Sequence, residues 1–265
     1  MTARRSGLRA IPLPLLLPIV GAATLIGVPL AALVVRAPWG DFASELSSPA
    51  VLTALRLSLV CSLSATLVSA LLGVPLAWLL ARVEFRGRRL LRALVMLPMI
   101  LPPVVGGVAL LLAFGRRGLV GLWLARLFDL QLPFSVAGAV LAETFVALPF
   151  LVMAAEAGFR QVDRRLEDAA ATLGATRLRV FARITLPLAA PALAAGAALC
   201  WARALGEFGA TITFAGNLPG RTQTLPLAVY LALETHPETA FALSLILLAV
   251  AIAVLVALRE QWLAQ

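Results

Sequence analysis

Three ionisable side chains lie inside long apolar stretches of the sequence: Glu143, Arg203 and Glu207. An ionisable group within a membrane-spanning segment is costly, so it is a functional candidate by default. Arg203 and Glu207 are four residues apart, which places them on one face of a helix, where they can pair. The guanidinium of Arg203 could help an oxyanion to cross, because its planar fork of donors suits such groups. Alternatively, the pair neutralises itself and only fixes its helix.

A polar segment follows this pair and offers neutral hydrogen-bond donors. Residues 209–227 are rich in Gly, Thr, Asn and Gln. Such groups can contact an oxyanion without holding it tightly, as a transport path requires. The segment could equally form a docking surface for another protein. The predicted path residues are Arg203, Glu207, Thr211, Thr213, Asn217, Thr222 and Gln223.

The sequence has no recognisable pattern for catalysis or metal binding. It lacks a G-x-x-x-x-G-K-[ST] motif, and all 22 of its basic residues are arginine, so it cannot build a P-loop. His236 stands alone, and neither Cys61 nor Cys200 has metal-ligand spacing. We therefore expect no cofactor, no metal and no enzymatic activity, and we expect ATP hydrolysis, if any, in a separate subunit.

The composition places these residues in a membrane. Of the 265 residues, 62% are hydrophobic and 13% are charged, which is about half the charged share usual for soluble domains. A soluble enzyme or a DNA-binding domain is thereby close to excluded. The net charge of +9 could suggest nucleic acid as a partner. A lipid membrane with arginine-rich cytoplasmic loops explains it better.

Six apolar stretches are long enough to span a bilayer, for which a helix needs roughly 20 residues. They predict an all-α polytopic membrane protein with one transmembrane domain over 1–265. The basic N-terminal tail and the basic segments after the second and fourth stretches fall on one side. The positive-inside rule makes that side cytoplasmic, together with both termini. The stretches are about 11–35, 54–81, 93–114, 134–155, 188–208 and 240–258.

The segment 156–187, between the fourth and fifth stretches, is polar, charged and too long for a tight turn. Asp163 can cap a short helix, and Gly174 stands where a C-cap glycine belongs. Thr176 can then cap a second short helix before Pro187 opens the next span. The first helix carries a stripe of small residues that suits docking into a groove on another protein. Alternatively, it lies flat on lipid headgroups.

This segment resembles the EAA loop of ABC importer permeases. That pattern is an acidic residue, two alanines, three residues, glycine, nine residues and Ile-x-Leu-Pro. Here it reads Asp168-Ala169-Ala170, Gly174 and Ile184-Thr185-Leu186-Pro187, with Glu167 just before it. The resemblance implies the type I importer fold, in which this loop forms a coupling helix in a cleft of a cytoplasmic ATPase. The implied contact residues are Glu167, Asp168, Ala169, Ala170 and Gly174.

Residues 203–230 are similar to the molybdate branch of these permeases. They contain Gly-Glu-Phe-Gly-Ala-Thr at 206–211 and Asn-x-Pro-Gly-x-Thr-Gln-Thr at 217–224. Sulfate permeases share the Gly-Glu and Gly-Asn-x-Pro parts and usually differ in the Thr-Gln-Thr part. The resemblance covers about 50–258, and it departs from the branch at Glu143, where an amide is common.

This second resemblance implies a molybdate permease in a bacterial plasma membrane that works by ATP-driven alternating access. The implied partners are a second permease copy in a homodimer, two cytoplasmic ATPase subunits and an extracytoplasmic molybdate-binding protein. A sulfate or tungstate permease is the alternative within the class. An ion-driven secondary transporter and an intramembrane enzyme are the alternatives from other classes.

Overall fold

The computed structural model describes residues 13–262, and within this range the chain forms helices joined by short connections and contains no strand. Five of these helical segments are long and apolar enough to cross a membrane. They are α1 (Leu13–Val35), α3 (Pro49–Arg82), α7 (Val136–Gln161), the segment 177–205 and α13 (Pro237–Trp262). The predicted all-α membrane architecture is confirmed.

The predicted third span, 93–114, is not one continuous helix. It is divided into α4 (Arg88–Ile100) and α5 (Pro103–Phe114), which meet at a bend of 119°. The consecutive prolines Pro102 and Pro103 explain the break. A proline disfavours helical backbone in the residue before it and cannot donate to the preceding turn, and Leu101 is accordingly extended. Counting this bent pair as one span gives the six that the sequence predicts.

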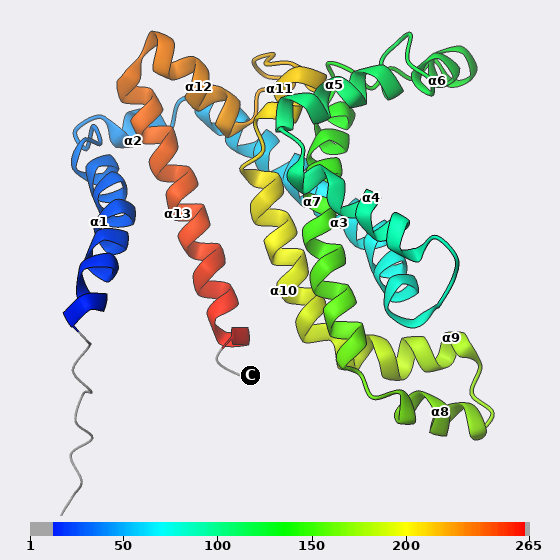
Figure 1. Ribbon diagram of the computed structural model, residues 1–265. Coiled ribbons are helices and arrows are strands. Elements are labelled where there is room, and N and C mark those ends of the chain that lie inside the picture. The colour runs from blue at the N-terminus through cyan, green and yellow to red at the C-terminus, as the bar shows by residue number, and fades with distance from the viewer. Residues whose placement is uncertain (1–12, 263–265) are drawn as a thin grey trace, which may run out of the picture.

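Three connections that the sequence predicts as outer loops contain helices. The connection after α1 contains α2 (Phe42–Leu46), and the connection after α5 contains α6 (Gly121–Phe128). The third contains α11 (Gly209–Ala215) and α12 (Leu225–Thr235). All four lie at one end of the molecule, opposite α8 and α9 (Figure 1).

The predicted loop at 156–187 is shorter and more helical than expected. Helix α7 continues to Gln161 and is followed by α8 (Arg164–Thr172). The second short helix does not end before Pro187. Instead α9 (Arg177–Val180) runs through a π-helical turn, η1 (Phe181–Thr185), into α10 (Leu186–Leu205). The helix can continue here because Pro187 lies in the first turn of α10, where proline is tolerated.

Small residues allow α7 to pack closely between α3 and α10 (Figure 1). A Cβ at Gly158 would lie 2.5 Å from the Cβ of Ala192, and one at Gly196 would lie 2.8 Å from the Cβ of Ala154. Helices in a membrane gain little from the hydrophobic effect and associate instead through such close contacts. These contacts fix the cytoplasmic ends of α7 and α10, between which α8 and α9 lie.

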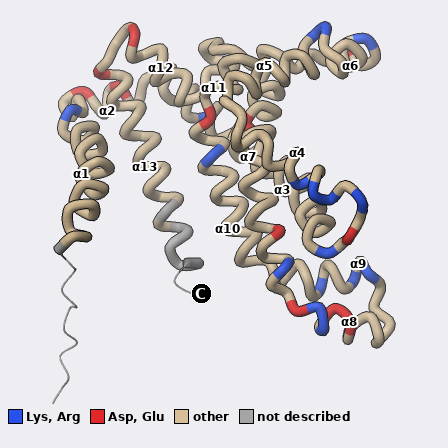
Figure 2. Tube along the Cα trace, in the orientation of Figure 1, with Lys and Arg blue, Asp and Glu red and all other residues tan. Residues whose placement is uncertain are grey.

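Charged residues are concentrated at the end of the molecule that carries α8, α9 and the start of α4 (Figure 2). The start of α1 and the end of α13 also point toward that end (Figure 1). This distribution agrees with the predicted cytoplasmic side. The N-terminal arginines Arg4, Arg5 and Arg9, which contributed to the prediction, lie outside the described residues.

Candidate coupling and translocation sites

Helix α8 has well-formed ends. The backbone N–H of Arg165 donates to Oδ1 of Asp163 at 2.9 Å, which confirms the predicted N-cap. Gly174 has φ +81°, and its N–H donates to the carbonyl of Ala171. The N–H of Ala175 donates to the carbonyl of Ala170, which completes a Schellman motif. The predicted C-cap glycine is therefore confirmed.

The corner between α8 and α9 offers apolar surface at the cytoplasmic end. Leu173 and Leu178 are 90% and 76% exposed. Asp168 and Ala169 are exposed beside them, and Ala170 is half-buried. An exposed apolar corner with small residues that allow close approach is suited to contact another protein.

Glu167 differs from its neighbours on α8, because its carboxylate is directed toward its own chain. Its Oε1 lies 3.2 Å from Nη2 of Arg82 and accepts a hydrogen bond of 2.6 Å from Oγ1 of Thr185. Its side chain is 19% exposed. This internal binding of Glu167 is not apparent from the motif.

Arg203 and Glu207 form the ion pair that their spacing predicts, with Nη1 and Oε2 separated by 2.5 Å. Glu207 is buried, and its Oε1 accepts a hydrogen bond of 2.7 Å from the backbone N–H of Ala210 in the first turn of α11. The carboxylate therefore joins α10 to α11. The side chain of Arg203 is 27% exposed, whereas that of Glu207 is 1% exposed.

Two buried polar atoms near this pair lack hydrogen-bond partners. They are Oε2 of Glu143, on α7, and Oγ1 of Thr211, on α11. Both residues are at most 1% exposed, and α11 packs against α7. A polar group without a partner in a buried environment lowers stability, so these atoms are candidates for a functional role.

The other four predicted path residues all make hydrogen bonds within the segment 209–227. Nε2 of Gln223 donates to Oδ1 of Asn217 at 2.9 Å. Oγ1 of Thr222 accepts from the N–H of Leu218, and Oγ1 of Thr213 donates to the carbonyl of Gly209. These bonds give the segment a defined shape. Gln223 also lines a cavity of about 170 Å³ with Ser48, Thr235 and His236, among other residues.

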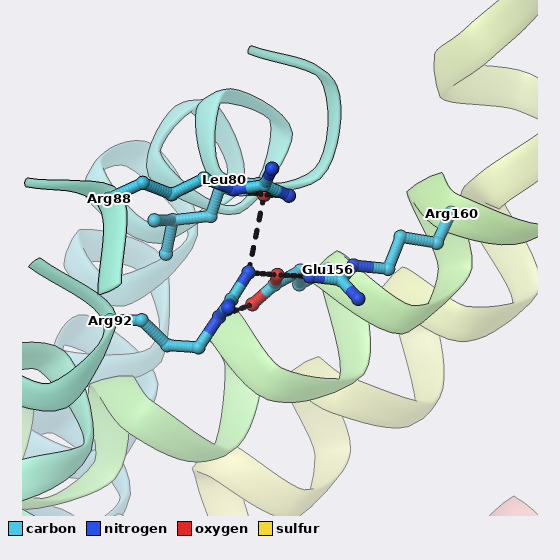
Figure 3. A network of polar contacts seen from close by, with 5 residues as sticks. All are labelled: Leu80, Arg88, Arg92, Glu156 and Arg160. Atoms are coloured by element: carbon cyan, nitrogen blue, oxygen red, sulfur yellow. Dashed lines mark hydrogen bonds and ion pairs between the residues drawn. The ribbon is translucent and has the colours of Figure 1, made fainter. Parts of the chain in front are cut away.

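An ion-pair network at the cytoplasmic end of the bundle is not predicted from the sequence (Figure 3). Glu156, on α7, binds Nε of Arg92 at 3.2 Å and Nη2 of Arg160 at 2.6 Å, and Arg92 and Arg88 also donate to the carbonyl of Leu80. The network joins α4 to α7 and α3. The spacing of Glu156 and Arg160 could have indicated one pair. Arg92 is 64 residues away from Glu156, and nothing in the sequence connects them.

A family match defines the class of this protein. Residues 73–265 match the family described as binding-protein-dependent transport system inner membrane component, and the chain belongs to this family. It is a multi-pass protein of the inner membrane and a subunit of a transport system.

The names of two relatives state a substrate, molybdenum for one and sulfate for the other. The chain is 47% identical over 235 residues to the molybdenum transport system permease protein ModB of Mycobacterium tuberculosis, covering 89% of each chain. It is 36% identical over 226 residues to the sulfate transport system permease protein CysT of Escherichia coli, covering 83% of this chain and 81% of that one.

A solved structure confirms the predicted permease fold. It is the bacterial alginate ABC transporter in complex with an alginate pentasaccharide-bound periplasmic protein. One of its chains superposes with a TM-score of 0.75 at 19% identity, covering 93% of this chain and 92% of that one.

Proposed function

We propose that this chain is the membrane-spanning subunit of an ATP-driven importer for molybdate. The assignment of molybdate as the substrate rests on the 47% identity with a molybdenum permease over most of both chains, against 36% identity with a sulfate permease. The observation that supports coupling to an ATPase is the capped helix α8, with exposed leucines at its corner with α9. A sulfate or tungstate importer is the second candidate, since the sulfate permease also matches most of this chain.

The proposed partners supply what one copy of this chain lacks. The sequence contains no lysine and therefore no P-loop, so we propose two ATPase subunits that bind the two copies of α8 in a permease homodimer. Helix α1 is apolar, and none of its residues from 14 to 35 is buried. A helix that is apolar all round needs lipid or protein around it. For the outer face we propose a molybdate-binding protein, because the related alginate transporter binds a periplasmic protein.

The proposed mechanism is alternating access. Binding of ATP brings the ATPase subunits together, α8 moves with them, and the spans rock open toward the loaded binding protein. The oxyanion then passes the outer segment 209–227 and the exposed part of Arg203. Because Arg203 is paired with Glu207 at 2.5 Å, the site carries no net charge and would hold a dianion only weakly. Weak binding is what a conduction path requires.

The test is transport in proteoliposomes that contain the permease, the ATPase and the binding protein. Uptake of molybdate should require both ATP and the binding protein, and tungstate should compete more strongly than sulfate. Uptake driven by an ion gradient without ATP would show a secondary transporter. If sulfate displaced molybdate at equal concentration, the protein would be a sulfate importer.

A further inference from the structure

Glu167 lies on the helix that we assign to the ATPase contact, yet it binds its own chain. Its neighbour Asp168 is exposed, whereas Glu167 is 19% exposed. One oxygen, Oε1, receives both the guanidinium of Arg82 at 3.2 Å and the hydroxyl of Thr185 at 2.6 Å. Three separate elements, α3, α8 and η1, therefore meet at this oxygen.

Arg82 connects α3 to the start of the coupling segment. It is the last residue of α3, and its side chain is 8% exposed. Besides Glu167, its Nη2 donates to the carbonyl of Val162 at 2.8 Å. Val162 lies between α7 and α8. One nitrogen of Arg82 thus holds both α8 and the connection that leads into it.

Thr185 connects the same carboxylate to the rod formed by α9, η1 and α10. It is the last residue of the π-helical turn and is 1% exposed. Single π-helical turns within helices are often found at functional sites. Here the turn immediately precedes α10, so its hydroxyl joins Glu167 to the base of a membrane span.

The remaining connections of α8 to the bundle are weak. Most of its side chains are exposed, and its packing partners are α9 and η1. Two short connections, 162–163 and 173–176, join it to the neighbouring helices. Without further contacts, a force applied to α8 could tilt it without moving the spans.

We propose that Arg82, Glu167 and Thr185 form a latch that transmits the movement of α8 to α3 and to the rod of α9 and α10. The inference rests on the proposed function, which gives α8 its contact with the ATPase. Glu167 is then a positioning residue, and Asp168 and the exposed leucines are left to make the contact itself. A largely desolvated ion pair suits this role, because separating its partners is costly.

The test compares Glu167→Gln with Glu84→Gln, a matched control in which the glutamate is exposed on the same side. In the reconstituted complex, the amount of molybdate transported per ATP hydrolysed is measured at equal amounts of copurified ATPase. Glu167→Gln should lower this ratio by about tenfold, a typical effect on coupling between sites, and Glu84→Gln should leave it unchanged. Equal ratios in the two variants would overturn the latch.

A second set of variants separates a latch from general stabilisation. If Arg82 and Glu167 act as a pair, the double variant Arg82→Gln with Glu167→Gln should be no worse than the more impaired single variant. The charge reversal Arg82→Glu with Glu167→Arg should recover part of the ratio. If the losses of the two single variants multiplied in the double variant, and the charge reversal recovered nothing, the pairing would be contradicted. Thr185→Val, which removes only the hydroxyl donor, gives the same comparison if Glu167→Gln assembles poorly.

Failure of the latch can be distinguished from failure of the proposed function. A wild-type complex that takes up no molybdate would overturn the function. The latch would then be judged by hydrogen exchange of the α8 backbone amides in the complex of permease and ATPase. Faster exchange in Glu167→Gln than in Glu84→Gln would support the latch, and equal exchange would overturn it.

Discussion

At the scale of single residues, the buried ionisable groups have different environments. Glu207 is bound by Arg203 and by the N–H of Ala210, so its charge is balanced. Glu143 is equally buried, but its Oε2 has no partner. Sequence reasoning gave both residues the same status as costly groups in a span. The structure separates Glu207, whose carboxylate joins two helices, from Glu143, whose Oε2 has no hydrogen-bond partner.

We predict that Glu143→Gln preserves transport and does not lower the melting temperature of the purified permease. The amide has nearly the same shape and removes a group that could carry an unpaired buried charge. The matched variant Glu207→Gln removes an ion-pair partner and should cost about 2 kcal/mol, seen as a lower melting temperature. Loss of uptake in a folded Glu143→Gln protein would instead assign the carboxylate to the path.

At the scale of elements, α8, which we propose as the coupling helix, depends on backbone conformation. Gly174 ends α8 with φ +81°, and a Cβ at this position would meet nothing within 4 Å. The glycine is therefore needed for its left-handed backbone and not for space. The chain can then turn from α8 directly into α9, which presents Leu173 and Leu178 at one corner.

We predict that Gly174→Val uncouples ATP hydrolysis from uptake. A side chain in left-handed backbone costs about 1–2 kcal/mol, and the chain can relieve this strain by changing the conformation of the corner between α8 and α9. Gly174→Asn should behave much like the wild type, since asparagine tolerates this conformation. The measurement is the uptake per ATP of each variant. Coupled uptake at the wild-type level in Gly174→Val would show that the corner is not part of the ATPase contact.

At the scale of the whole molecule, the asymmetry of charge sets the orientation. The end with α8, α9 and the start of α4 carries most of the arginines, and the end with α11 and α12 carries both acidic and basic residues (Figure 2). The outer end therefore provides little long-range attraction for an incoming anion. Delivery of the substrate by a binding protein is consistent with this distribution.

We predict that single cysteines introduced at exposed positions will confirm this orientation in labelling experiments. The variants are expressed without the ATPase. The native Cys61 and Cys200 are at most 1% exposed and should not react. Leu119→Cys, between α5 and α6, should be labelled by a membrane-impermeant thiol reagent added to spheroplasts. Leu173→Cys, at the end of α8, should react only in inverted vesicles. The opposite pattern would reverse the assigned topology.

The sequence by itself determined the class of the protein, and it predicted the orientation and the segment that we propose for coupling. Each of these depends on residues that are contiguous in the chain. Apolar runs predict spans because a membrane helix must form all of its backbone hydrogen bonds within one contiguous segment. The cap at Asp163 and the turn at Gly174 are readable because caps act over a few residues.

Only the tertiary structure decided which charged residues pair across the bundle. The chain has 22 arginines and 13 acidic residues, so spacing cannot select the distant partners, Arg92 for Glu156 and Arg82 for Glu167. Arg92 reaches Glu156 because α4 turns back along α7, and Arg82 reaches Glu167 because α3 ends beside α8. Such pairs depend on how helices pack, and in a membrane that packing is set by close contacts of small residues, as at Gly158 and Gly196.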